Sequence, residues 1–373
     1  MTASTTGARA LSAEGLRSLE AVARSQIERG WHAAAQLAVY RDGVCCLDLR
    51  LGERAPGVPM DDAARMLWFS ATKPLTAVCV LMLAEHGRID LDRPIAELWP
   101  EFAQGGKAAC TPRHVLTHRG GFPVFPATFD WSRIGDWEAV TAATASLEAA
   151  WPPGTAMGYH PVTYGFALGE LIRRVDGRDP RTFMRDELFG LLGMDASLGV
   201  DADALDAVVR LEAKSEVTFD DPEGSERRTS AIVARFNAAA TLQAQLPAAN
   251  AIGTAEALAR FYAMLERGGS LDGVRILGAP LVREATTLQA STEADRTTGF
   301  PAAVGFGIFL GPGFSPFDEP GVFGHSGQQC AVGYADPERG LAVGYVTNGL
   351  QDPVTVALRH AEIAAAIIAA CEE

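Results

Sequence analysis

Ser70 and Lys73 stand three residues apart in the stretch WFSATKPLT, residues 68–76. On a helical turn, two residues at this spacing share one face, with Cβ atoms roughly 5–6 Å apart. A serine hydroxyl is a poor nucleophile until a neighbouring group takes its proton. Lysine can take it or assist, because burial lowers the pKa of an amine, whereas arginine keeps its proton in proteins. The pair therefore indicates nucleophilic catalysis by Ser70.

The lysine at position 73 is unusual for this composition. The chain of 373 residues holds 32 Lys and Arg residues together, and only three are lysines: Lys73, Lys107 and Lys214. The pattern S-x-x-K nevertheless arises often by chance. A serine at an ordinary helix start, followed by a solvent-facing lysine, would have the same letters. On these residues alone, both interpretations stay open.

The elements around the pair place it at the start of a buried helix. Residues 74–87, PLTAVCVLMLAEHG, are apolar on nearly all sides, which is typical of a helix inside a core. Pro74 suits an early helical turn, where its missing N–H costs little. Ser70 and Lys73 then lie at or just before a helix N-terminus, whose field favours negative charge on the serine oxygen.

Both ends of the chain show strand patterns. Ser12 can cap a first helix that stops near Gly30, and two apolar runs then flank Asp42-Gly43 as in a β-hairpin. Short apolar runs separated by Gly, Pro, Asp and Asn return near the C-terminus, before a closing Ala/Ile/Val-rich helix. The sequence predicts an α+β fold, with an antiparallel sheet flanked by N- and C-terminal helices and an inserted helical lobe.

This organisation predicts two domains. Residues 1–68 and 251–373 form the sheet domain, and residues 69–250 form a mostly helical domain that carries the nucleophile. The polar stretch 214–230 is expected to be an exposed excursion.

Charge and composition exclude several functions. The net charge of −14 argues against binding to nucleic acid or to an anionic membrane surface. No apolar run is read as a spanning helix, and the first 20 residues lack the pattern of a secretory signal. The six cysteines have no paired spacing and the seven histidines form no metal motif. We expect a reduced, cytoplasmic protein without a metal or cofactor.

Longer motifs carry a resemblance that covers nearly the whole chain. SATKPLTAVCVLMLAEHGRIDLDRPI, TPRHVLTHRGG (111–121), PPGTAMGYHPVTYGFALGELIRRVDG (152–177) and the strands after GVFGHSG occur in the order typical of one family. The chain resembles the serine β-lactamase and penicillin-recognising superfamily. The resemblance implies a β-lactamase-like fold, with Ser70 as the nucleophile.

The resemblance also assigns further residues. The spacing after Pro153-Gly154 selects Tyr159 as the family's catalytic tyrosine. It would take the Ser70 proton with support from Lys73, since a phenol with an ordinary pKa near ~10 needs a nearby cation to act as a base. The implied mechanism is acyl transfer, with the N–H groups of Ser70 and Gln328 as the oxyanion hole.

Two departures from the family pattern narrow the activity. His325-Ser326-Gly327 stands where Lys-Thr-Gly is common, and Tyr159-His160-Pro161 replaces Tyr-x-Asn. Both changes weaken recognition of an anionic, amide-bearing substrate such as a β-lactam. The pattern is similar to the β-lactamase-like carboxylesterases called family VIII. His325 would contact substrate or tune Tyr159, unless it is a strand-edge histidine without a role.

Aromatic residues after His118 are candidates for an acyl pocket. Phe125 and Trp131 would line it, and ordinary core packing explains them equally well. His118 itself is expected to be structural. No G-x-S-x-G motif is present, which argues against an α/β-hydrolase.

The lead hypothesis is therefore a serine carboxylesterase that hydrolyses short-chain acyl esters. A weak β-lactamase, an amide hydrolase or an acyltransferase would use the same acyl-enzyme. A catalytically silent binding or scaffold protein of the same fold is the alternative from a different class. The expected partner is a small-molecule ester or a β-lactam, and the sequence carries no signal for an oligomeric state.

Overall fold

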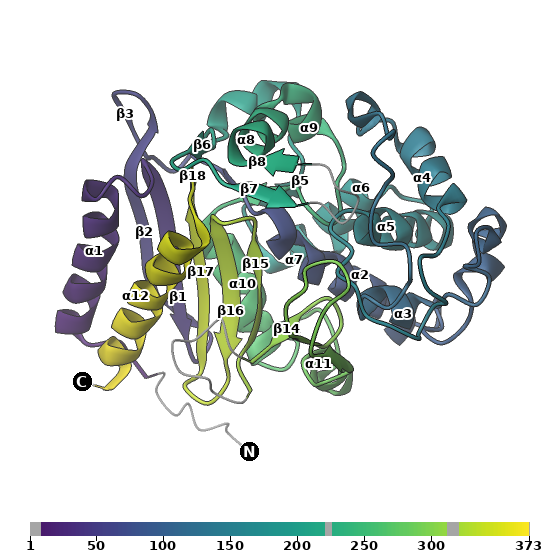
Figure 1. Ribbon diagram of the computed structural model, residues 1–373. Helices are drawn as coiled ribbons and strands as arrows, with labels where there is room; N and C mark the ends of the chain where they lie inside the picture. The colour runs from purple at the N-terminus through teal and green to yellow at the C-terminus, as the bar shows by residue number, and fades with distance from the viewer. Residues whose placement is uncertain (1–8, 221–225, 312–320, 373) are drawn as a thin grey trace, which may run out of the picture.

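One antiparallel sheet, built from both ends of the chain, organises the molecule (Figure 1). The computed structural model describes residues 9–220, 226–311 and 321–372. In these ranges nine strands form the sheet, in the order β12-β13-β14-β15-β16-β17-β1-β2-β3. They are β1 (Ala34–Arg41), β2 (Val44–Ala55), β3 (Val58–Pro59), β12 (Ala290–Thr292), β13 (Ala302–Val304), β14 (Phe309–Leu310), β15 (Phe323–Gly327), β16 (Ala331–Asp336) and β17 (Leu341–Thr347).

The central strands join the two termini of the chain. β1 pairs with β17 from Ala35↔Thr347 to Arg41↔Leu341. The predicted hairpin between β1 and β2 is confirmed: Asp42 and Gly43 have φ of 51° and 80°, as a tight two-residue turn requires. All eight residues of β1 are buried, because helices cover both faces of the sheet.

Helices from the two ends of the chain cover one face. α1 (Ala13–Glu28) begins at its Ser12 cap, whose hydroxyl accepts from Gly15 N at 2.8 Å. It packs beside α12 (Pro353–Glu372), while α10 (Ala255–Glu266) covers the opposite face against β1 and β17 (Figure 1). The predicted α+β arrangement is confirmed. The division at 68/69 and 250/251 stays a prediction.

The closing helix corrects one expectation. Pro353–Cys371 is long and apolar enough to cross a membrane by length and composition, with a mean hydropathy of 1.6. The interpretation that no run approaches spanning length is wrong here. Part of this helix is a core element, since Ile363 and Ile367 are buried against α1 and the sheet. A core helix passes the same test as a spanning one, so it is weak evidence for a membrane.

The segment between β4 and β9 forms the helical lobe. Its helices are η1 (Phe69–Thr72), α2 (Lys73–Glu85), η2 (Ile95–Glu97), η3 (Pro100–Ala103), α3 (Pro112–Leu116), η4 (Trp131–Arg133), α4 (Trp137–Ser146), α5 (Thr163–Asp176), α6 (Pro180–Met184), the π-helical η5 (Arg185–Phe189), α7 (Gly190–Leu192), η6 (Ala202–Ala207), α8 (Thr229–Asn237) and α9 (Ala239–Gln243). One further helix, α11 (Ala279–Ala285), follows β9 in the chain and lies outside this segment. The short strands are β4 (Met66–Leu67), β5 (Ala196–Leu198), β6 (Glu212–Ala213), β7 (Thr218–Asp220), β8 (Glu226–Arg228), β9 (Ala251–Gly253), β10 (Ser270–Leu271), β11 (Val274–Arg275) and β18 (Gly349–Leu350). Within the predicted excursion 214–230, residues 221–225 lie outside the described ranges.

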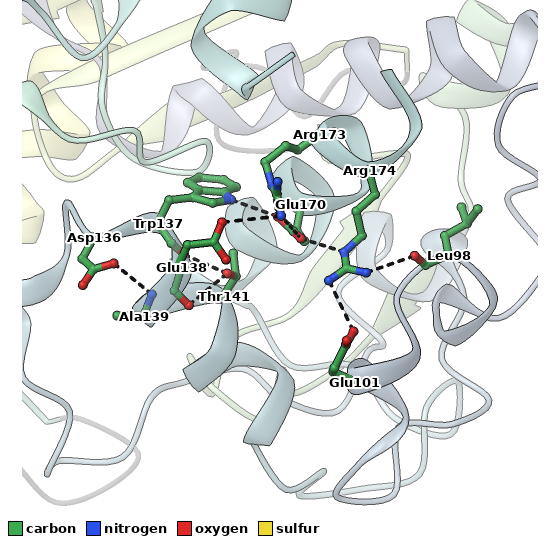
Figure 2. Close-up of polar contacts among 10 residues, drawn as sticks. All are labelled: Leu98, Glu101, Asp136, Trp137, Glu138, Ala139, Thr141, Glu170, Arg173 and Arg174. Atoms are coloured by element: carbon green, nitrogen blue, oxygen red, sulfur yellow. Dashed lines mark hydrogen bonds and ion pairs between the residues drawn. The ribbon is translucent and has the colours of Figure 1, made fainter. Parts of the chain in front are cut away.

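A buried carboxylate ties the helices of this lobe together. Glu170 on α5 has a side chain only 1% exposed, and it accepts from Trp137 Nε1 at 2.9 Å (Figure 2). Arg173 Nε and Arg174 Nε each donate to it at 2.7 Å, and Arg174 also pairs with Glu101 near η3. Because a buried charge is costly unless it is paired and hydrogen-bonded, this network fixes α4, η3 and α5 relative to one another. α5 begins four residues after Tyr159, so the network holds the helix that follows the tyrosine segment.

Candidate active site

Ser70 lies on a tight turn that feeds the buried helix α2. It belongs to η1, and α2 begins at Lys73 with Pro74 in its first turn. The preceding Phe69 has φ of 46°, a left-handed conformation that costs a non-glycine residue on the order of 1–3 kcal/mol. Thr72 Oγ1 stabilises this conformation by donating to Phe69 O at 2.6 Å. Ser70 keeps part of its surface exposed, so a substrate can reach it.

Lys73 is fully buried, and its amine has three polar neighbours. Nζ lies 3.1 Å from Ser70 Oγ, 2.8 Å from Pro161 O and 3.1 Å from Ala248 O. Burial holds the pKa of this amine well below its ordinary value. A neutral amine has two N–H donors for the two carbonyls and one lone pair for the Ser70 proton. An ammonium could donate to all three groups, so it is the lowered pKa that favours the uncharged amine, the form that can accept a proton.

The two carbonyls belong to distant segments, each held by buried polar groups. Ala248 lies in the loop before β9, where Asn250 Nδ2 donates to Thr241 O at 2.9 Å and to Ala244 O at 2.8 Å. Pro161 lies two residues after Tyr159, so the same segment supplies both a carbonyl to Lys73 and the tyrosine. The sequence did not predict either contact, because every residue has a backbone carbonyl and the residue type does not show which one reaches Lys73.

Tyr159 is close to both Ser70 and Lys73. Lys73 Nζ lies 4.7 Å from the centre of the tyrosine ring. Burial raises the pKa of the phenol above its ordinary value, while a hydrogen bond with Ser70 acts in the opposite direction and the Asp295 carboxylate raises it further. The expectation that a Lys73 cation lowers the tyrosine pKa is therefore wrong in its direction. The phenol is therefore neutral near pH 7 and can donate a proton, while burial disfavours the charged form of the Lys73 amine beside it.

The backbone around Tyr159 is fixed by groups that the sequence did not reveal. Tyr159 N donates to Asp295 Oδ1 at 3.0 Å, and Asp295 is itself buried. Gly158 N donates to His118 O at 3.0 Å, and His160 N donates to His118 Nδ1 at 3.2 Å. His118 thus has the structural contacts expected of it. Asp295 lies 136 residues after Tyr159 with no motif around it, and only the folded chain brings the two together.

The strand β15 borders the nucleophile on its other side. A Cβ placed on Gly327 would lie 2.1 Å from Trp68 O, so only glycine lets this strand approach the turn that carries Ser70. Gln328 follows directly, is partly exposed, and begins a turn closed by Cys330 N donating to Gly327 O at 3.3 Å. The end of β15 thus lies against the segment that leads into Ser70. An oxyanion hole formed by the N–H groups of Ser70 and Gln328 requires this proximity.

Comparison with known proteins places this arrangement in a family. The sequence model of the family described as Beta-lactamase matches residues 19–367. The chain belongs to the beta-lactamase family. It is 33% identical over 344 residues to "Esterase/beta-lactamase LipL" of Mycobacterium tuberculosis, covering 86% of this chain and 78% of that protein.

Solved structures agree with this assignment. A penicillin-binding protein homologue from Caulobacter crescentus has a TM-score of 0.81 at 30% identity, and a family VIII carboxylesterase has a TM-score of 0.82 at 25% identity. Each comparison covers 97% of this chain and 100% of the other. The predicted β-lactamase-like fold and superfamily are confirmed, and as a member of this family the protein is a serine hydrolase.

His325 departs from the lysine common at this position of the beta-lactamase family, and the structure shows its state. The ring is buried, with Nδ1 2.6 Å from Ser326 O, so Nδ1 carries the proton that this contact needs. Burial lowers the pKa of His325 to about 3. It is neutral near pH 7, and its ring centre lies 6.1 Å from that of Tyr159. Ser326, next on the strand, is exposed.

The two predicted pocket aromatics occupy different places. Phe125 is buried and stacks on Phe129 at 4.3 Å inside the aromatic cluster of the helical lobe. Trp131 lines a small apolar cavity of about 10 Å³. Its other walls include Val162, Phe236 and Ala249, and the first and last of these are chain neighbours of the residues whose carbonyls contact Lys73. Trp131 therefore lines a cavity and Phe125 does not, while a role for either residue in an acyl pocket stays a prediction.

No metal site is evident in the described ranges, where no group of three or more His, Cys, Asp or Glu side chains could hold an ion.

Proposed function

We propose that this enzyme is a carboxylesterase that hydrolyses short-chain acyl esters through an acyl-enzyme on Ser70. The observation that carries the proposal is the Lys73 amine, buried and 3.1 Å from Ser70 Oγ. Its only other hydrogen bonds in the described ranges go to backbone carbonyls. Burial without a carboxylate partner lowers the pKa of the amine, and its contact with the Ser70 hydroxyl puts it in place to act as a base.

The first half of the reaction forms the acyl-enzyme. Lys73 Nζ takes the Ser70 proton while Oγ bonds to the ester carbonyl carbon. The N–H groups of Ser70 and Gln328 stabilise the oxyanion, a contribution of ~3–4 kcal/mol per donor in other hydrolases. The C–O bond to the alcohol then breaks, and Tyr159 donates its proton to the leaving alkoxide. Lys73 returns a proton to Tyr159, so both groups regain their starting state.

Water completes the cycle by the same proton path in reverse. Tyr159 and Lys73 together accept a proton from water, which attacks the acyl carbon, and Ser70 leaves with a proton restored to it. The base is therefore the Lys73–Tyr159 pair, with the amine as the first acceptor.

The neutral His325 supports an uncharged ester as the substrate. A β-lactam carries a carboxylate, which the lysine common at this position can pair with. A buried neutral imidazole offers no such charge. A β-lactamase activity is the second candidate, because the relative from Mycobacterium tuberculosis is named for both activities.

A cytoplasmic location is part of the proposal. The six cysteines lie in the described ranges and all are free thiols, which suits a reducing compartment.

A substrate comparison tests the proposal. We expect p-nitrophenyl butyrate to be hydrolysed with kcat/KM at least ~100-fold above nitrocefin, the discrimination that one unpaired buried polar contact can supply. Ser70→Ala, the matched control, should abolish both activities. Nitrocefin turnover equal to or above that of the ester would instead favour the β-lactamase.

A further inference from the structure

The C-terminal helix places a buried guanidinium under the turn that follows β15. Arg359 on α12 is 0% exposed, and Nη1 donates to Gly349 O at 2.9 Å. Nη2 donates to Gln329 O. Among the described residues no carboxylate forms an ion pair with Arg359. A buried charge without a counterion is costly, and an apolar side chain of similar length would fill this space without that cost.

The turn that Arg359 contacts is strained. Gln329 has φ of 57°, a conformation that costs a non-glycine residue on the order of 1–3 kcal/mol. The amide atoms of the Gln329 side chain are buried and make no hydrogen bond within the described chain. The turn is held by Cys330 N donating to Gly327 O, and by Arg359 donating to the carbonyl of the strained residue itself.

Gln328 stands between the two ends of this turn. On one side, Gly327 pairs with Ala331 and packs on Trp68 O. On the other side, Arg359 holds the Gln329 carbonyl. Arg359 thus holds the Gln329–Cys330 peptide, whose Cys330 N–H donates to Gly327 O. Because Gly327 C=O shares its peptide plane with Gln328 N–H, this chain of contacts sets the direction of that N–H. An oxyanion donor must be fixed before the charge develops, since reorganisation during the reaction would cost rate.

We propose that Arg359 is a positioning residue of the oxyanion hole: it holds Gln329 in its left-handed conformation and thereby aims Gln328 N–H at the oxyanion. This inference rests on the proposed acyl-enzyme chemistry at Ser70. The guanidinium stays protonated, as arginine does in proteins, so its hydrogen bonds persist across the working pH range.

The test is Arg359→Met, assayed for ester hydrolysis and for binding of phenylboronic acid, which forms a tetrahedral anionic adduct on the serine. We expect kcat to fall ~10–100-fold, less than the ~10²–10³-fold that full loss of an oxyanion donor costs, with KM changed less than about threefold. Boronate affinity should fall by a similar factor to kcat. Guanidinium ion added to Arg359→Ala should restore part of the rate.

A matched control separates this role from general stability. Arg41 is also buried and also donates to two carbonyls, Ala10 O at 2.8 Å and Cys371 O at 3.3 Å, at the far end of α12. Arg41→Met should lower the melting temperature but leave kcat and boronate affinity within about threefold of wild type. If Arg359→Met does not fold, Arg359→Lys, which keeps the charge and one donor, should show a smaller loss of the same kind.

The outcomes distinguish two failures. If the wild-type protein is active and the Arg359 variants have the same kcat and boronate affinity as Arg41→Met, this inference alone is overturned. A wild-type protein without Ser70-dependent hydrolysis would overturn the proposed function and this inference with it.

Discussion

Lys73→Arg is expected to lower kcat for ester hydrolysis by ~10³–10⁴-fold, within the range that a positioned general base supplies. The variant keeps a positive charge of similar reach, but a guanidinium does not give up its proton in proteins. The buried Lys73 amine lies 3.1 Å from Ser70 Oγ, and its lowered pKa favours the form that offers a lone pair, which an arginine would not offer. Steady-state kinetics with p-nitrophenyl butyrate measures the loss.

A second buried lysine provides a control for the effect of packing a larger guanidinium group into the core. Lys107 is also fully buried, and its amine donates to Gln104 O at 2.9 Å, Ala145 O at 3.1 Å and Leu147 O. Lys107→Arg should lower stability without a comparable loss of kcat in the folded protein. Substantial activity in Lys73→Arg would show that only a positive charge is needed at position 73, against the proton transfer proposed for it.

Tyr159→Phe is expected to lower kcat by ~10²–10⁴-fold with little change in KM. The substitution removes only the hydroxyl, which hydrogen-bonds Ser70 and would protonate the leaving alcohol. The ring contacts with His118 and His325 would be kept, so the segment should stay in place. The rate with a poor leaving group, such as ethyl butyrate, should fall more than the rate with p-nitrophenyl butyrate, because p-nitrophenolate leaves without protonation.

Tyr164→Phe is the matched control, since Tyr164 is a buried tyrosine on the same segment whose hydroxyl lies 3.4 Å from Lys73 O. It should leave kcat within about tenfold of wild type. An equal loss in both variants, or equal sensitivity of both esters, would argue against Tyr159 as the proton donor.

Ser70, Lys73 and Tyr159 were accessible from sequence because their side chains carry the chemistry and their motifs are local. The N-terminal β-hairpin and the sheet built from both termini were predicted from short apolar runs separated by turn residues. The supporting groups were not accessible in this way. Pro161 and Ala248 act through backbone carbonyls, and Asp295 and Arg359 reach the site from segments without a motif.

The protonation states were also beyond the sequence. From the sequence, His325 was expected to contact substrate or tune Tyr159, and a Lys73 cation was expected to support Tyr159 as a base. Burial decides both instead, lowering the pKa of His325 to about 3 and that of Lys73 well below its ordinary value. Burial depends on the packing of the whole chain, and no local pattern of letters reports it.

The central claim is that Ser70 is a nucleophile activated by an uncharged amine. Intact-mass and peptide mass spectrometry after treatment with a fluorophosphonate test it most directly. We predict one adduct, on the peptide that contains Ser70, formed in wild type and slowed at least ~100-fold in Lys73→Met. A folded wild-type protein that acquires no adduct, or carries it on another residue, would contradict the claim and favour a catalytically silent binding protein of the same fold.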